Sequence, residues 1–249
     1  MPATPAWPPS SLPRLFVEQV LSEGAVLTLD GPPANYLGNV LRLAPGDQVK
    51  LFDDRTGEWL AEISDAGRKR VSLAVTRHLR PREPVPDLWL LFAPIKRGRI
   101  DWLIEKATEL GAARLVPVLT QRTIVDRLNL DRLRAHAVEA AEQCERTALP
   151  ELAEPRKLEA LLRDWPGDRS LYFADEAGGE PFAPVPGPAA ILIGPEGGFT
   201  DAERAAVRAL PQARPVSLGP RILRADTAAI AALSLWMAAA GDWTMKVAR

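Results

Sequence analysis

The sequence predicts two domains: a small β-barrel or β-sandwich, followed by an α/β domain built on a parallel sheet. Three observations predict this fold class. Short strand-like segments separated by turn signals fill residues 14–80. Prolines at 81, 84 and 86 then interrupt regular structure, because proline removes a backbone donor and restricts the residue before it. From residue 88 onward, apolar strand-length segments alternate with longer helical patterns, as in α/β folds.

The composition limits the class of protein. The 249 residues include 31 Lys and Arg against 32 Asp and Glu, and 47% are hydrophobic, which is ordinary for a globular chain. The longest weakly polar run, residues 228–240, is shorter than the roughly 20 residues of a membrane helix. One cysteine, Cys144, and two histidines offer neither an internal disulfide nor a zinc cluster. We expect a cytoplasmic protein that binds no metal and no membrane. The near-neutral charge gives no global argument for a nucleic-acid partner.

The first 80 residues are predicted to form an arm and a small β domain. Five prolines in residues 1–13 predict an extended, mobile arm. Residues 71–75 alternate between apolar and polar or small side chains, which is the period of a half-buried strand. A helix is predicted only at 35–43. The strands predicted here are 15–17, 25–29, 48–52, 59–63 and 71–75.

The second domain is predicted to alternate strands and helices. Apolar residues repeat at spacings of three and four through 100–110, and Gly111 ends that helix. Thr200 and Glu203 form a capping-box pattern that opens another helix. Further helices are predicted at 129–147, 155–164 and 227–240. The predicted strands are 88–93, 115–119, 170–173, 189–193 and 215–218. We place the two domains at 14–82 and 87–249.

A glycine-rich loop is the first candidate functional segment. The sequence IGPEGGFT (residues 193–200) leads from a buried strand into a capped helix. Glycine lets the backbone approach a ligand closely, and ligands of open sheets bind beyond the carboxyl ends of strands. The loop is neither a P-loop nor a dinucleotide-binding fingerprint, because the required spacings are absent. Taken alone, it could also be a tight strand-to-helix turn.

A second loop, LGPRILRADTA (residues 218–228), also follows a strand and opens a helix that Asp226 or Thr227 could cap. Arg221 and Arg224 flank two aliphatic residues, which solubility alone does not require. Taken alone, the two arginines could also pair with surface carboxylates.

Together these loops resemble the signatures of the RsmE family of SPOUT methyltransferases, which methylate N3 of a uridine in ribosomal RNA. Further similarity lies in RLFV (14–17), YLGNVLRLAPGD (36–47), KRGRIDWLIEKATELGA (96–112), QRTIVDR (121–127) and EAAEQCERTALPEL (139–152). The resemblance implies a PUA-like β-barrel that binds RNA, followed by a SPOUT α/β domain threaded as a trefoil knot. It also implies S-adenosylmethionine as the cofactor and a homodimer. The implied substrate is small-subunit ribosomal RNA, free or in the assembled subunit.

The resemblance also assigns site residues. The implied cofactor contacts are Phe173, Ala174, Ile193, Gly194, Glu196, Gly197, Gly198, Leu218, Gly219, Ile222 and Leu223. The expected phosphate contacts are Arg14, Lys96, Arg97, Arg99, Arg122 and Arg146, with Arg68, Lys69 and Arg70 as possible helpers. Where glutamate is common in the family, this chain has Asp226.

A chemical hypothesis follows for the catalytic residues. Deprotonation of uridine N3 leaves an anion spread over the flanking carbonyl oxygens. We expect Arg221 or Arg224 to stabilise this anion, and Glu196 to assist proton removal or orient an arginine. Alternatively, Glu196 binds the amides of its own loop. Two other functions stay open: an RNA-binding protein that lacks catalysis, and an α/β enzyme that uses a different nucleotide.

Overall fold

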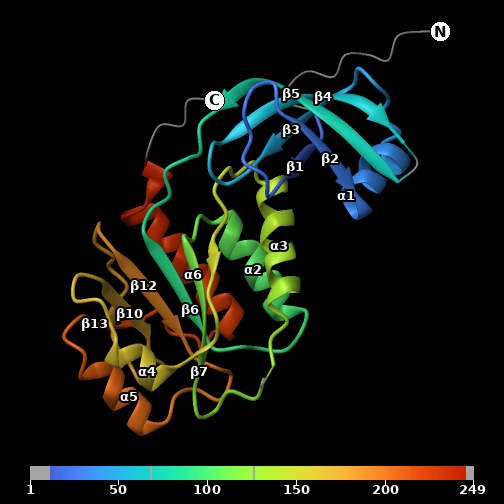
Figure 1. Cartoon of the computed structure of the whole chain (residues 1–249). Helices are drawn as coiled ribbons and strands as arrows, with labels where there is room; N and C mark the ends of the chain where they lie inside the picture. The colour runs from blue at the N-terminus through green and yellow to red at the C-terminus, as the bar shows by residue number, and fades with distance from the viewer. Residues whose placement is uncertain (1–11, 68, 126, 245–249) are drawn as a thin grey trace. The chain divides into compact units, whose positions relative to one another are not determined.

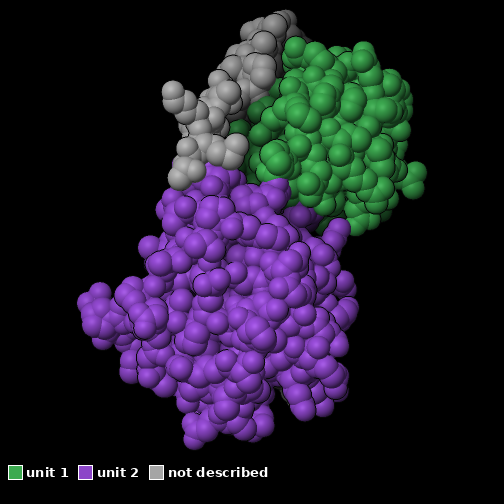
Figure 2. Space-filling model, turned by 90° about the vertical axis from the view of Figure 1, so that its left-hand side faces the viewer, with its two compact units in different colours: residues 1–84, 141–148 green, residues 85–140, 149–249 purple. Residues whose placement is uncertain are grey.

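The computed structural model describes residues 12–67, 69–125 and 127–244, and the chain divides into two compact units. Unit 1 comprises residues 1–84 and 141–148, and unit 2 comprises residues 85–140 and 149–249 (Figure 2). Most of the predicted arm, residues 1–11, lies outside the described residues, and so does Arg68.

Unit 1 contains a five-stranded sheet with the order β1-β3-β4-β5-β2 (Figure 1). Its strands are β1 (Arg14–Phe16), β2 (Val26–Asp30), β3 (Gln48–Phe52), β4 (Glu58–Ala66) and β5 (Arg70–Arg80). β1 pairs in parallel with β3, and the other pairs are antiparallel. Val71, Leu73 and Val75 are buried as their alternation predicts, and they pack in one core with Val49 and Leu51. The five strands predicted in this region are all present, with longer β4 and β5.

The helical segment of unit 1 begins earlier than predicted. A short helix, α1 (Gly31–Asn35), runs directly into a π-helical turn (Tyr36–Val40), whereas the sequence predicted one helix at 35–43. Two prolines follow Gly31, and proline suits the first turn of a helix because the amides there have no intrahelical partner. Arg42 then has a positive φ of 56°, which ends the helical backbone.

Residues 141–148 belong to unit 1, although the sequence predicted them in the second domain. The guanidinium of Arg14 binds the carboxylate of Glu58 and donates to the carbonyls of Ala141 and Arg146. The carboxylate of Glu83 accepts hydrogen bonds from the backbone amides of residues 147 and 148, at 2.9 and 3.2 Å. Two polar anchors therefore hold this segment in unit 1.

Unit 2 is an α/β domain around a parallel sheet with the order β11-β13-β10-β12-β6-β7-β8, and β9 pairs with β7 (Figure 1). Every strand pair is parallel, which confirms the prediction. The strands are β6 (Leu88–Phe92), β7 (Arg114–Leu119), β8 (Glu151–Leu152), β9 (Arg156–Lys157), β10 (Ser170–Ala174), β11 (Glu180–Pro181), β12 (Ala189–Ile193) and β13 (Ala213–Ser217). The helices are α2 (Arg99–Glu109), α3 (Leu130–Gln143), α4 (Leu158–Arg163), α5 (Asp201–Arg208) and α6 (Ala225–Ala239), followed by a 3-10 turn (Asp242–Thr244).

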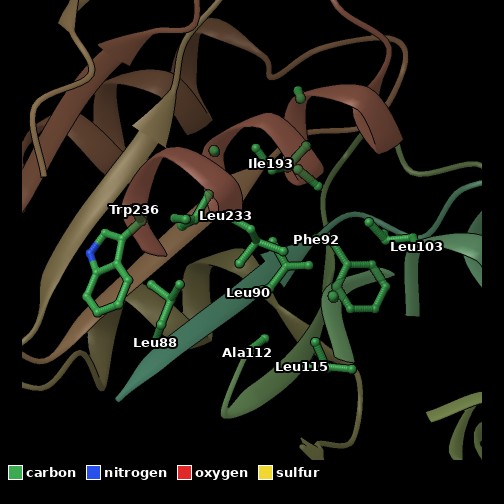
Figure 3. Packing of buried hydrophobic residues seen from close by; sticks show 14 of the residues in the cluster. Leu88, Leu90, Phe92, Leu103, Ala112, Leu115, Ile193, Leu233 and Trp236 are labelled. Carbon is green, nitrogen blue, oxygen red and sulfur yellow. The ribbon is translucent and has the colours of Figure 1, made fainter. Parts of the chain in front are cut away.

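Helices cover both faces of the sheet in unit 2. On one face, Leu88, Leu90 and Phe92 of β6 pack with residues of α2 and α6, among them Leu103 and Trp236 (Figure 3). On the other face, the alternate residues of β6, β10 and β12 pack against α4 and α5. Burial on both faces explains why these strands are continuously apolar in sequence.

Several helix ends differ from their predicted positions. α3 ends at Gln143 rather than near 147, and α4 begins at Leu158 because β9 occupies the two residues before it. α6 begins at Ala225 with Arg224 at its N-cap and without a side-chain cap, so the predicted capping by Asp226 or Thr227 is wrong. The capping box of Thr200 and Glu203 is confirmed at the start of α5.

Within the described part of the chain, none of the helices has the length and apolar character needed to cross a lipid bilayer. The same residues contain no cluster of three or more His, Cys, Asp or Glu side chains arranged to hold a metal ion.

Candidate functional site

A pocket of about 380 Å³ lies in unit 2 where the loops after β10, β12 and β13 meet. These strands are neighbours in the sheet, in the order β13-β10-β12. Because they are parallel, their carboxyl ends lie at the same edge, which is where open α/β sheets bind ligands. The volume falls within the roughly 300–1,000 Å³ typical of small-molecule sites.

The pocket brings together most of the predicted site residues. Nine of the predicted cofactor contacts line it, namely Ala174, Ile193, Gly194, Glu196, Gly198, Leu218, Gly219, Ile222 and Leu223. The predicted catalytic residues Arg221 and Arg224 line it as well, and so does Glu196. The two loops singled out in the sequence therefore form one concave site.

Two predicted cofactor contacts lie beside the pocket rather than in its wall. Phe173 is fully buried and packs edge-on against Phe199, with ring centroids 5.0 Å apart. The carbonyl of Gly197 accepts a hydrogen bond from Arg122 at 2.8 Å. Phe173 is thus part of the core beneath the pocket, whereas Gly197 is exposed and held by Arg122.

The loop after β12 needs its glycines for packing. A Cβ atom at Gly194 would lie 2.6 Å from the ring of Phe199, which is itself buried. Gly198 has a φ of +68°, and a Cβ there would collide with the carboxylate of Glu176. The capping box then ends the loop, since Thr200 and Glu203 exchange hydrogen bonds at the start of α5. The loop is thus close-packed on one side and faces the pocket on the other.

The loop after β13 is far more exposed. Gly219 has a φ of +110°, a conformation that favours glycine. Arg221 and Arg224 are exposed, and Ile222 is 94% exposed. Asp226, just inside α6, forms an ion pair with Arg99 of α2 at 3.1 Å. The loop therefore presents two cations and an aliphatic side chain at the pocket, and its far end is held by this ion pair.

The loop after β10 contains a residue that the sequence did not reveal. The side chain of Asp175 is fully buried and forms ion pairs with Arg204 and Arg208 of α5. Burial raises the pKa of Asp175, but hydrogen bonds from Arg208, the amide of Ala177 and Arg204 outweigh it and hold the pKa below its ordinary value. Ligands of open α/β sheets bind beyond the carboxyl ends of strands, and this rule pointed to the loop after β10. Asp175 is the first residue beyond the end of that strand.

The predicted phosphate contacts fall into three groups. Lys96 and Arg97 are exposed in the loop between β6 and α2. Arg99 and Arg122 are engaged with Asp226 and with the carbonyls of 197 and 199, respectively. Arg14 and Arg146 are 9% and 7% exposed in unit 1.

Burial of Arg14 and Arg146 argues against their predicted contacts with RNA phosphates, which need exposed cations. Arg14 binds Glu58 and backbone carbonyls, and Arg146 lies 3.7 Å from the carboxylate of Glu83. Both arginines have structural roles in unit 1, and this corrects the sequence-based prediction.

Comparison with known proteins agrees with this geometry. Residues 81–237 match a family model described as an RNA methyltransferase domain. Residues 29–76 match a model described as an RNA methyltransferase PUA domain. The first model covers unit 2 through nearly the whole of α6, including all three loops of the pocket.

Individual relatives match over nearly their whole length. Ribosomal RNA small subunit methyltransferase E of Rickettsia conorii is 30% identical over 229 residues, which cover 89% of this chain and 93% of that protein. A Legionella pneumophila methyltransferase, solved with its bound cofactor SAM, is 31% identical with a TM-score of 0.84 and covers 92% of this chain and 98% of that one. A ribosomal RNA small subunit methyltransferase E of Neisseria gonorrhoeae was solved bound to S-adenosyl methionine. It is 27% identical with a TM-score of 0.84, and the match covers 94% of this chain and 100% of that one.

These matches confirm the resemblance predicted from the sequence, with a PUA-like domain and a SPOUT-like parallel α/β domain. The chain belongs to the RNA methyltransferase family that includes ribosomal RNA small subunit methyltransferase E.

Proposed function

We propose that this protein transfers a methyl group from S-adenosylmethionine to N3 of a uridine in small-subunit ribosomal RNA. The observation that carries the proposal is that the glycine loop (residues 193–200) and the loop of Arg221 and Arg224 (residues 218–228) line one pocket. Two relatives that match over more than nine-tenths of this chain were solved with the same cofactor. The name of the relatives supports the small subunit as substrate.

The residues of the pocket fit S-adenosylmethionine. Ile193, Leu218 and Leu223 provide aliphatic surface for a flat adenine ring. The backbone of Gly194 and Gly219 is open to close approach, and it can serve the hydrogen-bonding edge of the ring. The carboxylates of Glu176 and Glu196 also line the pocket, and they favour a cationic ligand. When bound, the cofactor supplies an electrophilic methyl group on its sulfonium.

The residues of the chain would then orient the uridine and stabilise its charge. Methyl transfer needs the attacking nitrogen in line with the methyl group, so alignment provides much of the catalysis. Arg221 and Arg224 place two positive charges in the lining of the pocket, where the anion of a deprotonated uridine would form. Glu196 is exposed and lines the same pocket, and we assign it to proton removal or to orienting an arginine.

RNA binding beyond the pocket is assigned to exposed cations. Lys96 and Arg97 are exposed in the loop just before α2, and Arg99 of that helix is paired with Asp226 of α6. We infer that this end of α2 contacts RNA phosphates. The PUA-like domain of unit 1 supports a further RNA contact.

Three further properties are proposed from family membership. We expect a cytoplasmic protein, since ribosomal RNA is its substrate, and a trefoil knot in the carboxyl-terminal part of unit 2. We also expect a homodimer, in line with the small side chains of α6, where Ala238 and Ala239 are exposed. Light scattering at working concentration tests the dimer, and a monomeric mass would contradict it.

Mass spectrometry of ribosomal RNA from cells that lack this gene tests the function. We expect one methyluridine of the small subunit to disappear and to return when the gene is restored. It should not return with a variant in which both Arg221 and Arg224 are alanine. Unchanged methylation in the deletion strain would contradict the proposal. Normal RNA binding without S-adenosylmethionine binding would instead indicate a non-catalytic RNA-binding protein.

A further inference from the structure

Asp175 lines the pocket, but its carboxylate is buried and its hydrogen-bonding sites are already occupied. Oδ1 accepts from Nε of Arg204 and from the amide of Ala177, both at 3.0 Å. Oδ2 accepts from Nη2 and Nε of Arg208 at 2.6 and 3.1 Å. A carboxylate has about four acceptor sites, so Asp175 has little capacity left for a ligand. Its role is therefore to hold other groups.

The arginines that bind Asp175 also hold the rest of its loop. Nη2 of Arg208 donates to the carbonyl of Gly178 at 2.8 Å, and Nη2 of Arg204 lies 3.3 Å from the carboxylate of Glu176. Residues 174–176 and Gly178 line the pocket. Two side chains on adjacent turns of α5 therefore anchor this wall of the pocket along its length.

The same helix is also joined to the neighbouring wall, which is formed by the glycine-rich loop after β12. α5 begins directly after the glycine loop, and the capping box of Thr200 and Glu203 fixes this junction. Glu203 also accepts from the amide of Gln121 at 2.7 Å, and Arg122 donates to the carbonyl of Gly197. Across the walls, the backbone of Gly198 lies against the carboxylate of Glu176, which would have to move to admit a Cβ atom. α5 thus connects two walls of the pocket that come from different strands.

We propose that Asp175, Arg204 and Arg208 form a positioning cluster that sets the spacing between the β10 loop and the glycine loop and so determines the affinity for the cofactor. The inference rests on the proposed function, because it names the pocket as the cofactor site. A preorganised site binds more tightly because the ligand does not have to order the loops. Loss of the cluster should therefore weaken S-adenosylmethionine binding without slowing methyl transfer at saturation.

Three substitutions separate this role from other effects of charge. Asp175→Asn replaces the central carboxylate by a neutral amide of the same size. Arg208→Gln removes the guanidinium that binds Asp175 and Gly178. Arg208 has a side chain 43% exposed, so its replacement should leave the core intact. Asp201→Asn is the matched control, because Asp201 is exposed and also pairs with Arg204, but at the helix surface rather than at the loop.

The experiment combines calorimetry of S-adenosylmethionine binding with steady-state methylation of small ribosomal subunits, at temperatures well below each melting transition. For Asp175→Asn and Arg208→Gln we expect the Kd and the KM for S-adenosylmethionine to rise about tenfold or more, as loss of charge-assisted hydrogen bonds predicts. The kcat should stay within about twofold, because the lost binding contributes equally to the ground state and the transition state. Asp201→Asn should behave as wild type.

Several results would overturn the inference. Unchanged Kd in both cluster variants would do so, as would a loss of kcat with unchanged KM. If Asp201→Asn weakened S-adenosylmethionine binding equally, the effect would come from any change of charge on α5 rather than from this cluster. If Asp175→Asn does not fold, Arg208→Gln decides the outcome. Absence of binding by the wild-type protein would contradict the proposed function itself, which distinguishes the two failures.

Discussion

At the scale of single residues, two exposed arginines supply positive charge to a pocket that is also lined by glycines, aliphatic side chains and carboxylates. Arg221 and Arg224 lie on the same short loop and line the same pocket as Glu196. An anion that forms only during the reaction is stabilised best by donors that are already in place. We therefore treat the two cations as the source of transition-state stabilisation, and the rest of the pocket as the source of cofactor binding.

Replacing Arg221 or Arg224 by alanine tests this division. At least one of the two variants should lose about 10²- to 10³-fold in kcat, as removal of a preorganised donor does elsewhere. The Kd for S-adenosylmethionine should change little, and calorimetry serves as the control. If both variants keep near-normal turnover in steady-state assays, the electrostatic assignment is wrong.

Gly194 offers a test of close packing in the glycine loop. Alanine there would bring a Cβ within 2.6 Å of the buried ring of Phe199, so the loop or the ring must shift and disturb this wall of the pocket. We expect Gly194→Ala to weaken cofactor binding in calorimetry. Gly167→Ala is the matched control, because its Cβ would meet only the side chain of Gln212 at 4.0 Å. Equal binding by the two variants would show that the loop tolerates the shift.

At the scale of elements, the buried ion cluster of unit 1 anchors the segment 141–148. Glu58 pairs with both Arg14 and Arg80, while Arg14 and Arg80 donate to backbone carbonyls of that segment. Burial raises the pKa of Glu58, but hydrogen bonds from Arg80 and Arg14 outweigh it and hold the pKa below its ordinary value. The cluster is satisfied only while this carboxylate is charged.

A carboxyl group with a lowered pKa in the folded state stabilises the fold above its unfolded pKa, and that contribution is lost as the pH falls through the folded value. Unit 1 should therefore lose stability in acid, below the ordinary carboxyl pKa near 4.5. At neutral pH, Glu58→Gln should lower the free energy of unfolding by about 3–5 kcal/mol, because Arg14 stays buried without its counter-charge.

Urea denaturation at pH 7 and in acid measures both effects. Between the two pH values, Glu58→Gln should lose less free energy of unfolding than wild type. An equal acid-induced loss in both proteins would contradict the assignment to Glu58.

Elements with strong local signals were predictable from the sequence. The five longer strands of the parallel sheet (β6, β7, β10, β12 and β13) and the capping box of α5 depend on neighbouring residues and were placed within one or two residues, whereas the two-residue strands β8, β9 and β11 were not predicted. Helix ends were less predictable where a distant partner sets them. α3 stops at Gln143, and residues just beyond it contact Arg80 and Glu83 within unit 1, contacts that no local pattern reveals.

The parts of the site that lie within continuous sequence motifs were predictable. Both loops lie within continuous motifs, and the strand-end rule predicts that they meet at one edge of the sheet. Asp175 was missed because its role comes from Arg204 and Arg208, about 30 residues further along the chain. Arg14 and Arg146 were misassigned because a sequence gives the charge of an arginine but not its burial.

At the scale of the whole molecule, RNA binding should depend on salt through a limited set of exposed cations. Lys96 and Arg97 are the predicted phosphate contacts that remain exposed and without an assigned structural role. Removing one cation that binds a phosphate should reduce the slope of log affinity against log salt by about 0.7–0.9.

Filter binding of ribosomal RNA across a salt series should therefore give a shallower slope for the double alanine variant at 96 and 97. Arg163→Ala is the control, since Arg163 is exposed on α4, which packs on the other face of the sheet from α2. If the double variant at positions 96 and 97 has the same slope as wild type, this end of α2 does not belong to the RNA-binding surface.

The most direct test of the account is a crystal structure of this protein grown with S-adenosylmethionine. We predict density for the cofactor in the pocket of unit 2, in contact with the loop at 193–199 and the loop at 217–225, with its methyl group on the side of Arg221 and Arg224. Cofactor density elsewhere in the molecule would contradict the claim that these two loops enclose the methyl donor. A pocket without cofactor density, in crystals grown at saturating cofactor, would contradict it as well.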